Sequence, residues 1–191
     1  MDVSAEDLAW LSQRIGVFDP GAKALSSSSI IDDPQAGLVV EPTGVAGSAA
    51  PVIALVGWPT GRHHSLIKAA EARLAVQEGA GEIWLAVDTD LLVAGDNSSA
   101  SAVLADIIAV SQVVDEPARV GVVAGSVDKQ KIEALARIAQ RAEVAVLAVP
   151  AGADLPSTAC ELAVYGVETL EGAVDALYAG AHRVFITPAS R

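Results

Sequence analysis

Short apolar runs alternate with longer amphipathic runs along most of this chain. The clearest apolar run is PVIALVGW (Pro51–Trp58), and EIWLAVD (Glu82–Asp88) repeats the pattern. Strands that are apolar on both faces are typical of a parallel sheet covered by helices. We predict seven strands, at Leu38–Pro42, Pro51–Trp58, Glu82–Asp88, Arg119–Ala124, Val144–Val149, Ala159–Tyr165 and Arg183–Thr187.

Amphipathic runs between these strands predict helices. They cover Ser4–Ile15, Leu66–Glu78, Ser98–Val114, Asp128–Arg141 and Thr169–Ala179. The stretch Gly16–Gly37, rich in Ser, Asp, Pro and Gly, has no helical period and is predicted to be an irregular loop. The β-α units are short and even, and no Gly-rich nucleotide-binding loop occurs. We therefore expect an α/β fold: one TIM-type (β/α) barrel domain over residues 1–191, truncated at the N-terminus.

Charge and composition exclude several classes of function. The formal net charge is -12 and the chain has no basic stripe, so neither nucleic acid nor an anionic membrane surface is an expected partner. The apolar runs are shorter than the roughly 20 residues that span a bilayer. The first residues, MDVSAEDLAWLSQRI, do not form a secretory signal, and the single cysteine, Cys160, excludes an intrachain disulfide. We expect a cytoplasmic protein.

A series of short motifs begins at the end of the predicted strand Pro51–Trp58. GWPTG (Gly57–Gly61) comes directly after a strand, Lys68 and Glu71 lie on the next helix, and GAGEI (Gly79–Ile83) starts the next strand. LLVAGD (91–96) and GVETLE (166–171) follow in order. From about Leu38 to Ser190 the chain resembles deoxyribose-phosphate aldolase, a class I aldolase on a β/α barrel. In that family a strand precedes the first helix, and its absence here would explain the count of seven.

The resemblance implies where catalytic residues should stand. The acid/base aspartate of the family falls on Trp84, the Schiff-base lysine on Val146 and the second lysine on Leu162. Two phosphate-site glycines fall on aromatic residues, Tyr165 and Phe185. We expect Trp84, Val146 and Leu162 to point inward and fill a former substrate cavity.

The four lysines of the chain are Lys23, Lys68, Lys129 and Lys131, and none falls at a predicted strand end. A class I aldolase needs a lysine nucleophile inside the barrel. We therefore predict no aldolase activity, and the chain leans towards not being an enzyme. No cofactor is expected.

Polar residues gather in the loops predicted at the C-terminal face of the barrel, where sites of this fold lie. Possible ligand-binding residues there are Glu41, His63, His64, Asp88 and Asp90. Their spacing matches no recognised metal-ligand motif, and no metal is predicted. Two hypotheses remain: a catalytically inactive pseudoenzyme with a binding or scaffolding role, or a lyase-like enzyme with altered chemistry at these loops.

A seven-stranded barrel would leave two unpaired strand edges, at Leu38–Pro42 and Arg183–Thr187. Exposed edges are normally covered, paired or closed. We predict that the Gly16–Gly37 loop and a second copy of the chain cover them, which makes the protein a homodimer.

Overall fold

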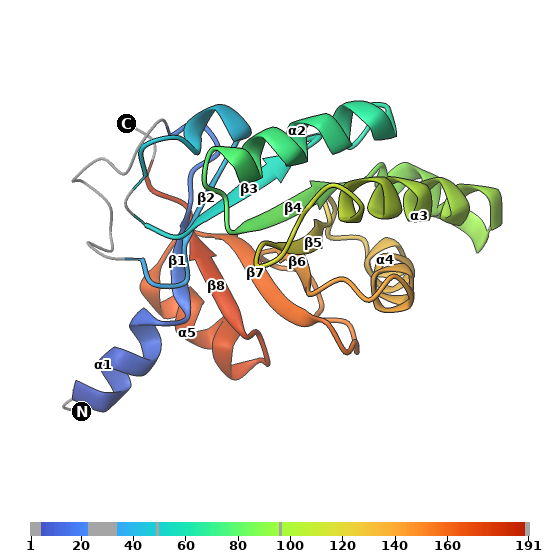
Figure 1. Cartoon of the computed structure of the whole chain (residues 1–191). Helices are drawn as coiled ribbons and strands as arrows, with labels where there is room; N and C mark the ends of the chain where they lie inside the picture. Colours follow the sequence, from blue (N-terminus) through green and yellow to red (C-terminus); the bar gives the residue numbers. More distant parts are fainter. Residues whose placement is uncertain (1–4, 23–33, 49, 96, 190–191) are drawn as a thin grey trace.

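The protein is a closed barrel of eight parallel strands in sequential order (Figure 1). The computed structural model describes residues 5–22, 34–48, 50–95 and 97–189. The TIM-type fold expected from the strand and helix pattern is confirmed. The strands are β1 (Ile15–Phe18), β2 (Leu38–Val40), β3 (Val52–Val56), β4 (Glu82–Ala86), β5 (Arg119–Val123), β6 (Val146–Pro150), β7 (Glu161–Val167) and β8 (Arg183–Ile186).

The barrel has eight strands, so the predicted count of seven is wrong. The additional strand is β1, which pairs with β2 on one side and with β8 on the other. It closes both edges that were expected to be open, and the predicted need for a covering loop or subunit disappears. Gly16 allows this closure, since a Cβ there would lie 2.5 Å from the Gly37 carbonyl oxygen and 2.6 Å from the Phe185 ring.

The described part of the chain has five α-helices. They are α1 (Ala5–Ser12), α2 (Ser65–Gln77), α3 (Asn97–Ser111), α4 (Lys129–Arg141) and α5 (Leu170–Tyr178), with 3₁₀ turns η1 (Pro42–Gly44) and η2 (Thr89–Gly95). The Asp128 carboxylate caps α4 by accepting from the backbone N–H groups of Gln130 and Lys131. Within the residues described, no helix is both long and apolar enough to cross a bilayer.

Two apolar layers make the core. An outer layer lies between the strands and helices and includes Leu85, Leu147 and Val164. An inner layer fills the lumen of the barrel and includes Trp84, Val146 and Phe185. Successive side chains of a strand point to opposite faces, so each strand contributes to both layers. This alternation decides which residues could ever reach a site inside the barrel.

Candidate functional site

Aromatic side chains fill the lumen, which was expected to be packed shut. Trp84 and Phe185 are fully buried and meet edge to face, with ring centroids 4.9 Å apart. The indole N–H of Trp84 donates to Oε1 of Glu82 over 2.6 Å. Gly121 makes room for the indole, because a Cβ at this position would lie 3.2 Å from Cδ1 of Trp84. The centre of the barrel is thus a packed core with its one polar indole group satisfied.

The C-terminal mouth of the lumen is plugged by three more rings. Phe18 stacks on Tyr165 with centroids 4.7 Å apart, and Trp58 meets both rings edge-on at 5.8 and 5.9 Å. The Tyr165 hydroxyl donates to the carbonyl oxygen of Ala124 over 2.7 Å. Burial raises the pKa of Tyr165 to about 12. Tyr165 is therefore a neutral hydrogen-bond donor that does not ionise at physiological pH.

Two of the three positions matched to catalytic residues lie in the lumen, as expected. Trp84 and Val146 both belong to the inner layer and are fully buried. Leu162 belongs to the outer layer, so its predicted inward orientation is wrong. The lumen-facing residues of β7 are its neighbours Ala163 and Tyr165. Neither of these two residues carries the amine that a Schiff base requires.

The lysines described by the structure lie outside the lumen. Lys68 is fully buried beneath the loop that follows β3, and its Nζ donates to the Gly61 carbonyl over 2.5 Å and to Oδ2 of Asp106 over 2.6 Å. Lys129 and Lys131 are on α4 and pair with Asp154 and Asp90. Lys23 lies outside the described residues.

Lys68 and Glu71 have a structural role that the sequence analysis missed. Oε2 of Glu71 accepts a 2.7 Å hydrogen bond from the backbone N–H of Gly57. Gly57 has a φ of +70°, and the Lys68 methylenes approach to 3.1 Å of the place where its Cβ would lie. Two side chains of α2, Lys68 and Glu71, thus hold the two ends of the GWPTG loop. The sequence feature that could have indicated this role is the GWPTG turn followed, on the next helix, by Lys-x-x-Glu.

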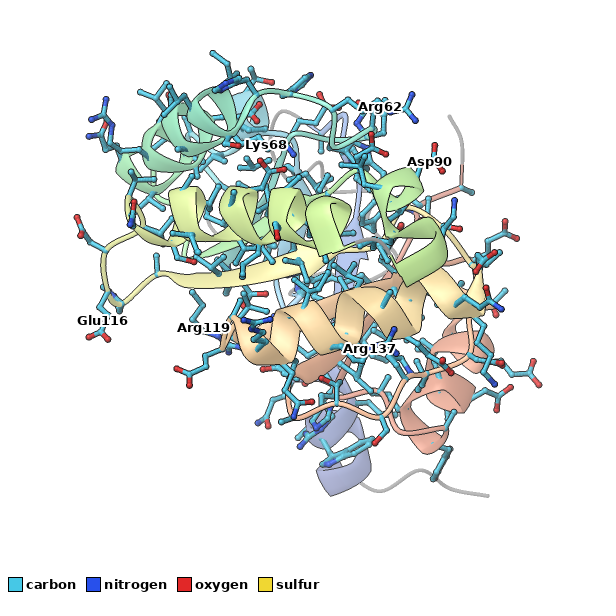
Figure 2. All side chains as sticks on the ribbon, turned by 90° about the vertical axis from the view of Figure 1, so that its right-hand side faces the viewer. Arg62, Lys68, Asp90, Glu116, Arg119 and Arg137 are labelled. Atoms are coloured by element: carbon cyan, nitrogen blue, oxygen red, sulfur yellow. The ribbon has the colours of Figure 1, made fainter. Side chains whose placement is uncertain are left out.

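The polar loops at the C-terminal face form ion pairs rather than a ligand set. Arg62 donates to Asp88 over 3.0 Å and to Asp90 over 2.6 Å, and Lys131 donates to Asp90 over 2.6 Å. The hydrogen bond from Lys131 is the main cause that lowers the pKa of Asp90, with the charges of Lys131 and Arg62 adding to it. Figure 2 shows Arg62 and Asp90 at the same end of the barrel.

The remaining loop residues do not join this ion-pair cluster. Nδ1 of His64 accepts from the backbone N–H of Leu66 and caps α2. His63 and Glu41 have exposed side chains. Among the described residues, no three His, Cys, Asp or Glu side chains converge so that they could hold a metal ion.

Charged side chains close the opposite, N-terminal pole of the barrel. They are the first residues of four strands: Glu82, Arg119, Glu161 and Arg183. Arg183 donates to Oε1 of Glu82 over 2.8 Å and also to Glu161, while Arg119 donates to Glu161 over 2.6 Å. Burial raises the pKa of Glu161, but the Arg119 hydrogen bond and the two guanidinium charges outweigh it, so the pKa lies below its ordinary value.

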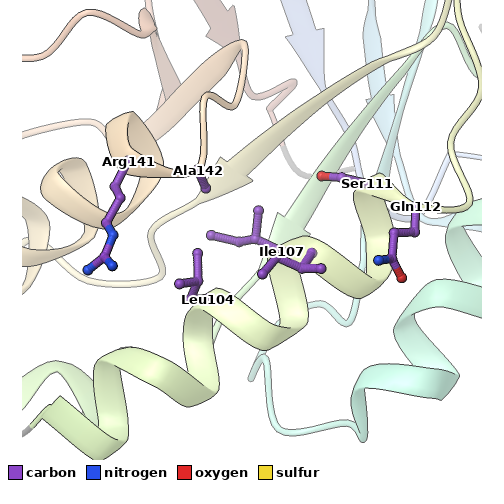
Figure 3. Close-up of a pocket in the computed structure, with 7 residues that line it drawn as sticks. Leu104, Ile107, Ser111, Gln112, Arg141 and Ala142 are labelled. Carbon is purple, nitrogen blue, oxygen red and sulfur yellow. The ribbon is translucent and has the colours of Figure 1, made fainter.

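A shallow pocket of about 380 Å³ lies on the outside of the barrel, between α3 and α4 (Figure 3). Leu104, Ile107, Ile108 and Ala142 form its apolar lining, and Ser111, Gln112 and Arg141 its polar side. It is separated from the lumen by the strands. It therefore does not correspond to the site at the C-terminal face that the fold predicts.

Comparison with known proteins agrees with the barrel and its motifs. A deoxyribose-phosphate aldolase of Corynebacterium jeikeium is 34% identical over 161 residues, covering 82% of this chain and 58% of the relative. Another, of Nocardia farcinica, is 40% identical over 93 residues, covering 48% and 40%. The chain thus spans about half the length of these relatives. No protein-family model matches it.

Solved structures support the same fold. An aldolase named QR15 superposes with a TM-score of 0.72 at 16% identity, covering 93% of this chain and 90% of that one. The tetrameric deoxyribose phosphate aldolase of Aeropyrum pernix superposes with a TM-score of 0.60 at 19% identity, covering 98% and 88%. Fold and motifs together define a (β/α) barrel of the aldolase type. In sequence the chain is similar to deoxyribose-phosphate aldolases.

Proposed function

We propose that this chain is a catalytically inactive member of the deoxyribose-phosphate aldolase family, a pseudoenzyme with a binding or scaffolding role. The observation that carries the proposal is the lumen: it is filled by Trp84, Tyr165 and Phe185, and no lysine is found among its described residues. A class I aldolase needs a neutral lysine amine facing an open cavity. Here the described strands offer neither the amine nor the space.

The aromatic rings also argue against binding of a sugar phosphate. A sugar phosphate at the mouth of a barrel needs backbone N–H groups that it can approach closely, which small residues permit. Phe18, Trp58 and Tyr165 occupy that mouth. We further propose a cytoplasmic, homo-oligomeric protein. It is proposed to have no nucleic-acid partners, because the chain carries a net charge of -12 and no basic stripe.

The geometry of the polar loops does not favour the lyase-like alternative. Asp88 and Asp90 are paired with Arg62 and Lys131, and Nδ1 of His64 is occupied by the helix cap. A general acid or base must be able to reach a substrate proton. These contacts instead tie the loops after β3 and β4 to α4.

Borohydride trapping tests the proposal directly. The protein is incubated with 2-deoxyribose 5-phosphate and sodium borohydride, and its mass is compared with that of the Nocardia farcinica relative treated identically. We expect a reduced covalent adduct on the relative and an unchanged mass for this chain. An adduct mapped by peptide digestion to any residue of this chain, Lys23 included, would overturn the proposal.

A further inference from the structure

The pocket between α3 and α4 has the size and the lining of a small-molecule site (Figure 3). Its volume of about 380 Å³ lies within the range of about 300–1,000 Å³ that is usual for ligand pockets. Leu104, Ile107, Ile108 and Ala142 form its apolar walls. Apolar walls with a few polar groups at one side are typical of sites that hold a mostly apolar molecule by one polar end.

The polar side of the pocket presents groups that the rest of the described chain leaves unpaired. Ser111, Gln112 and Arg141 have exposed side chains, and none of the three forms a side-chain hydrogen bond or an ion pair with a described residue. The guanidinium of Arg141 is permanently charged, and the hydroxyl and amide can donate beside it. A ligand whose polar end is an oxygen anion would match these donors.

A second unpaired arginine lies one turn away on the same helix. Arg137 of α4 is exposed, forms no ion pair with a described residue, and shares a helix face with Arg141 four positions later (Figure 2). The two lysines of this helix, Lys129 and Lys131, are instead paired with aspartates of other segments. The free positive charge of α4 is thus concentrated at the end where the pocket lies.

Local charge decides which kind of ligand the pocket favours. Helices α3 and α4 both end beside the pocket, and each helix C-terminus carries about half a negative charge. The two guanidinium groups exceed this charge, and the exposed Glu143 just beyond α4 pairs with neither of them. Charges elsewhere on the chain are screened beyond about 10 Å at moderate salt. The pocket therefore favours an anion although the net charge of the chain is -12.

We propose that this pocket binds a small carboxylic acid with an apolar body. The hydrocarbon part lies against Leu104, Ile107 and Ile108, and the carboxylate accepts hydrogen bonds from Arg141. Arginine matches a carboxylate with two parallel N–H donors, and such charge-assisted hydrogen bonds are stronger than neutral ones. A single negative charge suits this acidic chain, because a doubly charged phosphate would meet more repulsion from it.

This site is independent of the proposed loss of catalysis. The strands separate the pocket from the lumen, so it would bind the same ligand in an active or an inactive barrel. A negative result here would leave the borohydride result unaffected, and an adduct in the borohydride experiment would leave the pocket unaffected.

Titration with octanoate, followed by NMR of the leucine and isoleucine methyl groups, tests the site. We expect the methyl signals of Leu104, Ile107 and Ile108 to shift, while those of Leu170, 53% exposed on α5 and away from α3 and α4 (Figure 1), stay in place. Octanol and octylamine carry the same hydrocarbon chain with a neutral and a positive head group. Octanoate should bind more tightly than octanol, and octylamine most weakly.

Three variants separate the charge of the site from its shape. Arg141→Met keeps an apolar stem without the charge, and should weaken octanoate binding by about fivefold or more while octanol binding stays the same. Lys129→Met is the matched control, because it removes an exposed cation from the other end of α4 and should leave the affinity for octanoate unchanged. Ser111→Trp places a large ring at the pocket and should weaken binding of both probes.

The outcomes that would overturn the proposal are distinct from these. Equal affinity for octanoate, octanol and octylamine would indicate unspecific adsorption to an apolar surface. An octanoate affinity that Arg141→Met leaves as high as Lys129→Met does would exclude the arginine as the carboxylate partner. Methyl shifts as large at Leu170 as in the pocket, or no shift in the pocket below the concentration at which octanoate forms micelles, would exclude the site itself.

Discussion

Trp84 occupies the centre of the lumen, and its contacts predict a large energetic role. Replacing it by alanine removes an indole that is fully buried against Phe185 and leaves an enclosed void. Such truncations cost about 3–5 kcal/mol of unfolding free energy. We expect urea denaturation of Trp84→Ala to show a loss of this size. The matched control is Trp10→Ala, because Trp10 is 46% exposed and its loss should cost about 1 kcal/mol or less. Equal losses in both variants would contradict a filled lumen.

Single residues also show where the sequence stops being informative. The burial of Trp84 was predictable, because it stands within an apolar run that alternates with helices. The orientation of Leu162 was not, because β7 is apolar on both faces and period two then says nothing about which face is inward. His64 was assigned to a ligand-binding loop, whereas its ring caps α2. A histidine directly before a helix fits either role in sequence alone.

The unit of β3, its loop and α2 depends on one buried ion pair. Lys68 is fully buried, and the Asp106 side chain is 15% exposed. Lys68→Met keeps the aliphatic stem but leaves the Asp106 carboxylate with an unpaired charge. Breaking a buried pair in this way typically costs about 3–5 kcal/mol, and thermal or urea unfolding will measure it.

Lys129→Met provides the comparison for this ion pair. The Lys129–Asp154 pair is exposed on both sides, so its loss should cost at most about 1 kcal/mol. A Lys68→Met variant as stable as Lys129→Met would show that the pair does not hold the GWPTG loop.

Elements that a clear pattern sets apart from their neighbours were predictable, and strand β1 was not. Helices α2 to α5 and strands β2 to β8 all fall within or next to their predicted segments. Strand β1 was missed because its four residues, IGVF, follow a helical pattern directly and precede a stretch without any period. Part of that stretch, residues 23–33, lies outside the described structure. Strand β1 closes the barrel by pairing with β8, and no local pattern encodes this contact between the two ends of the chain.

At the scale of the whole molecule, ion pairs close the N-terminal pole and predict an acid response. The pKa of Glu161 is below its ordinary value of 4.5 in the folded protein, so the unfolded chain binds the proton more readily. The stabilisation is complete above about pH 4.5 and is lost as pH falls through the lower folded value. Glu161→Gln should therefore flatten the decline of unfolding free energy in this acid range.

The control for the acid response is Glu133→Gln, at an exposed position of α4. Urea midpoints measured from neutral pH down to the acid range should follow the unaltered protein in this control. A Glu161→Gln variant with the same acid slope as Glu133→Gln would show that the pole does not depend on Glu161.

The aromatic lumen described above has one further consequence, which concerns guests rather than substrates. Removing the Trp84 side chain would leave a chamber lined by Leu55, Val146 and Phe185, with the Glu82 carboxylate at one wall. Enclosed apolar voids in proteins take up small aromatic molecules, and a guest that binds only the folded state raises its melting temperature. Free indole matches both the lost ring and its N–H donor. The Trp84→Ala variant should therefore bind free indole, and its affinity for indole would measure how rigidly the surrounding strands keep the shape of the missing ring.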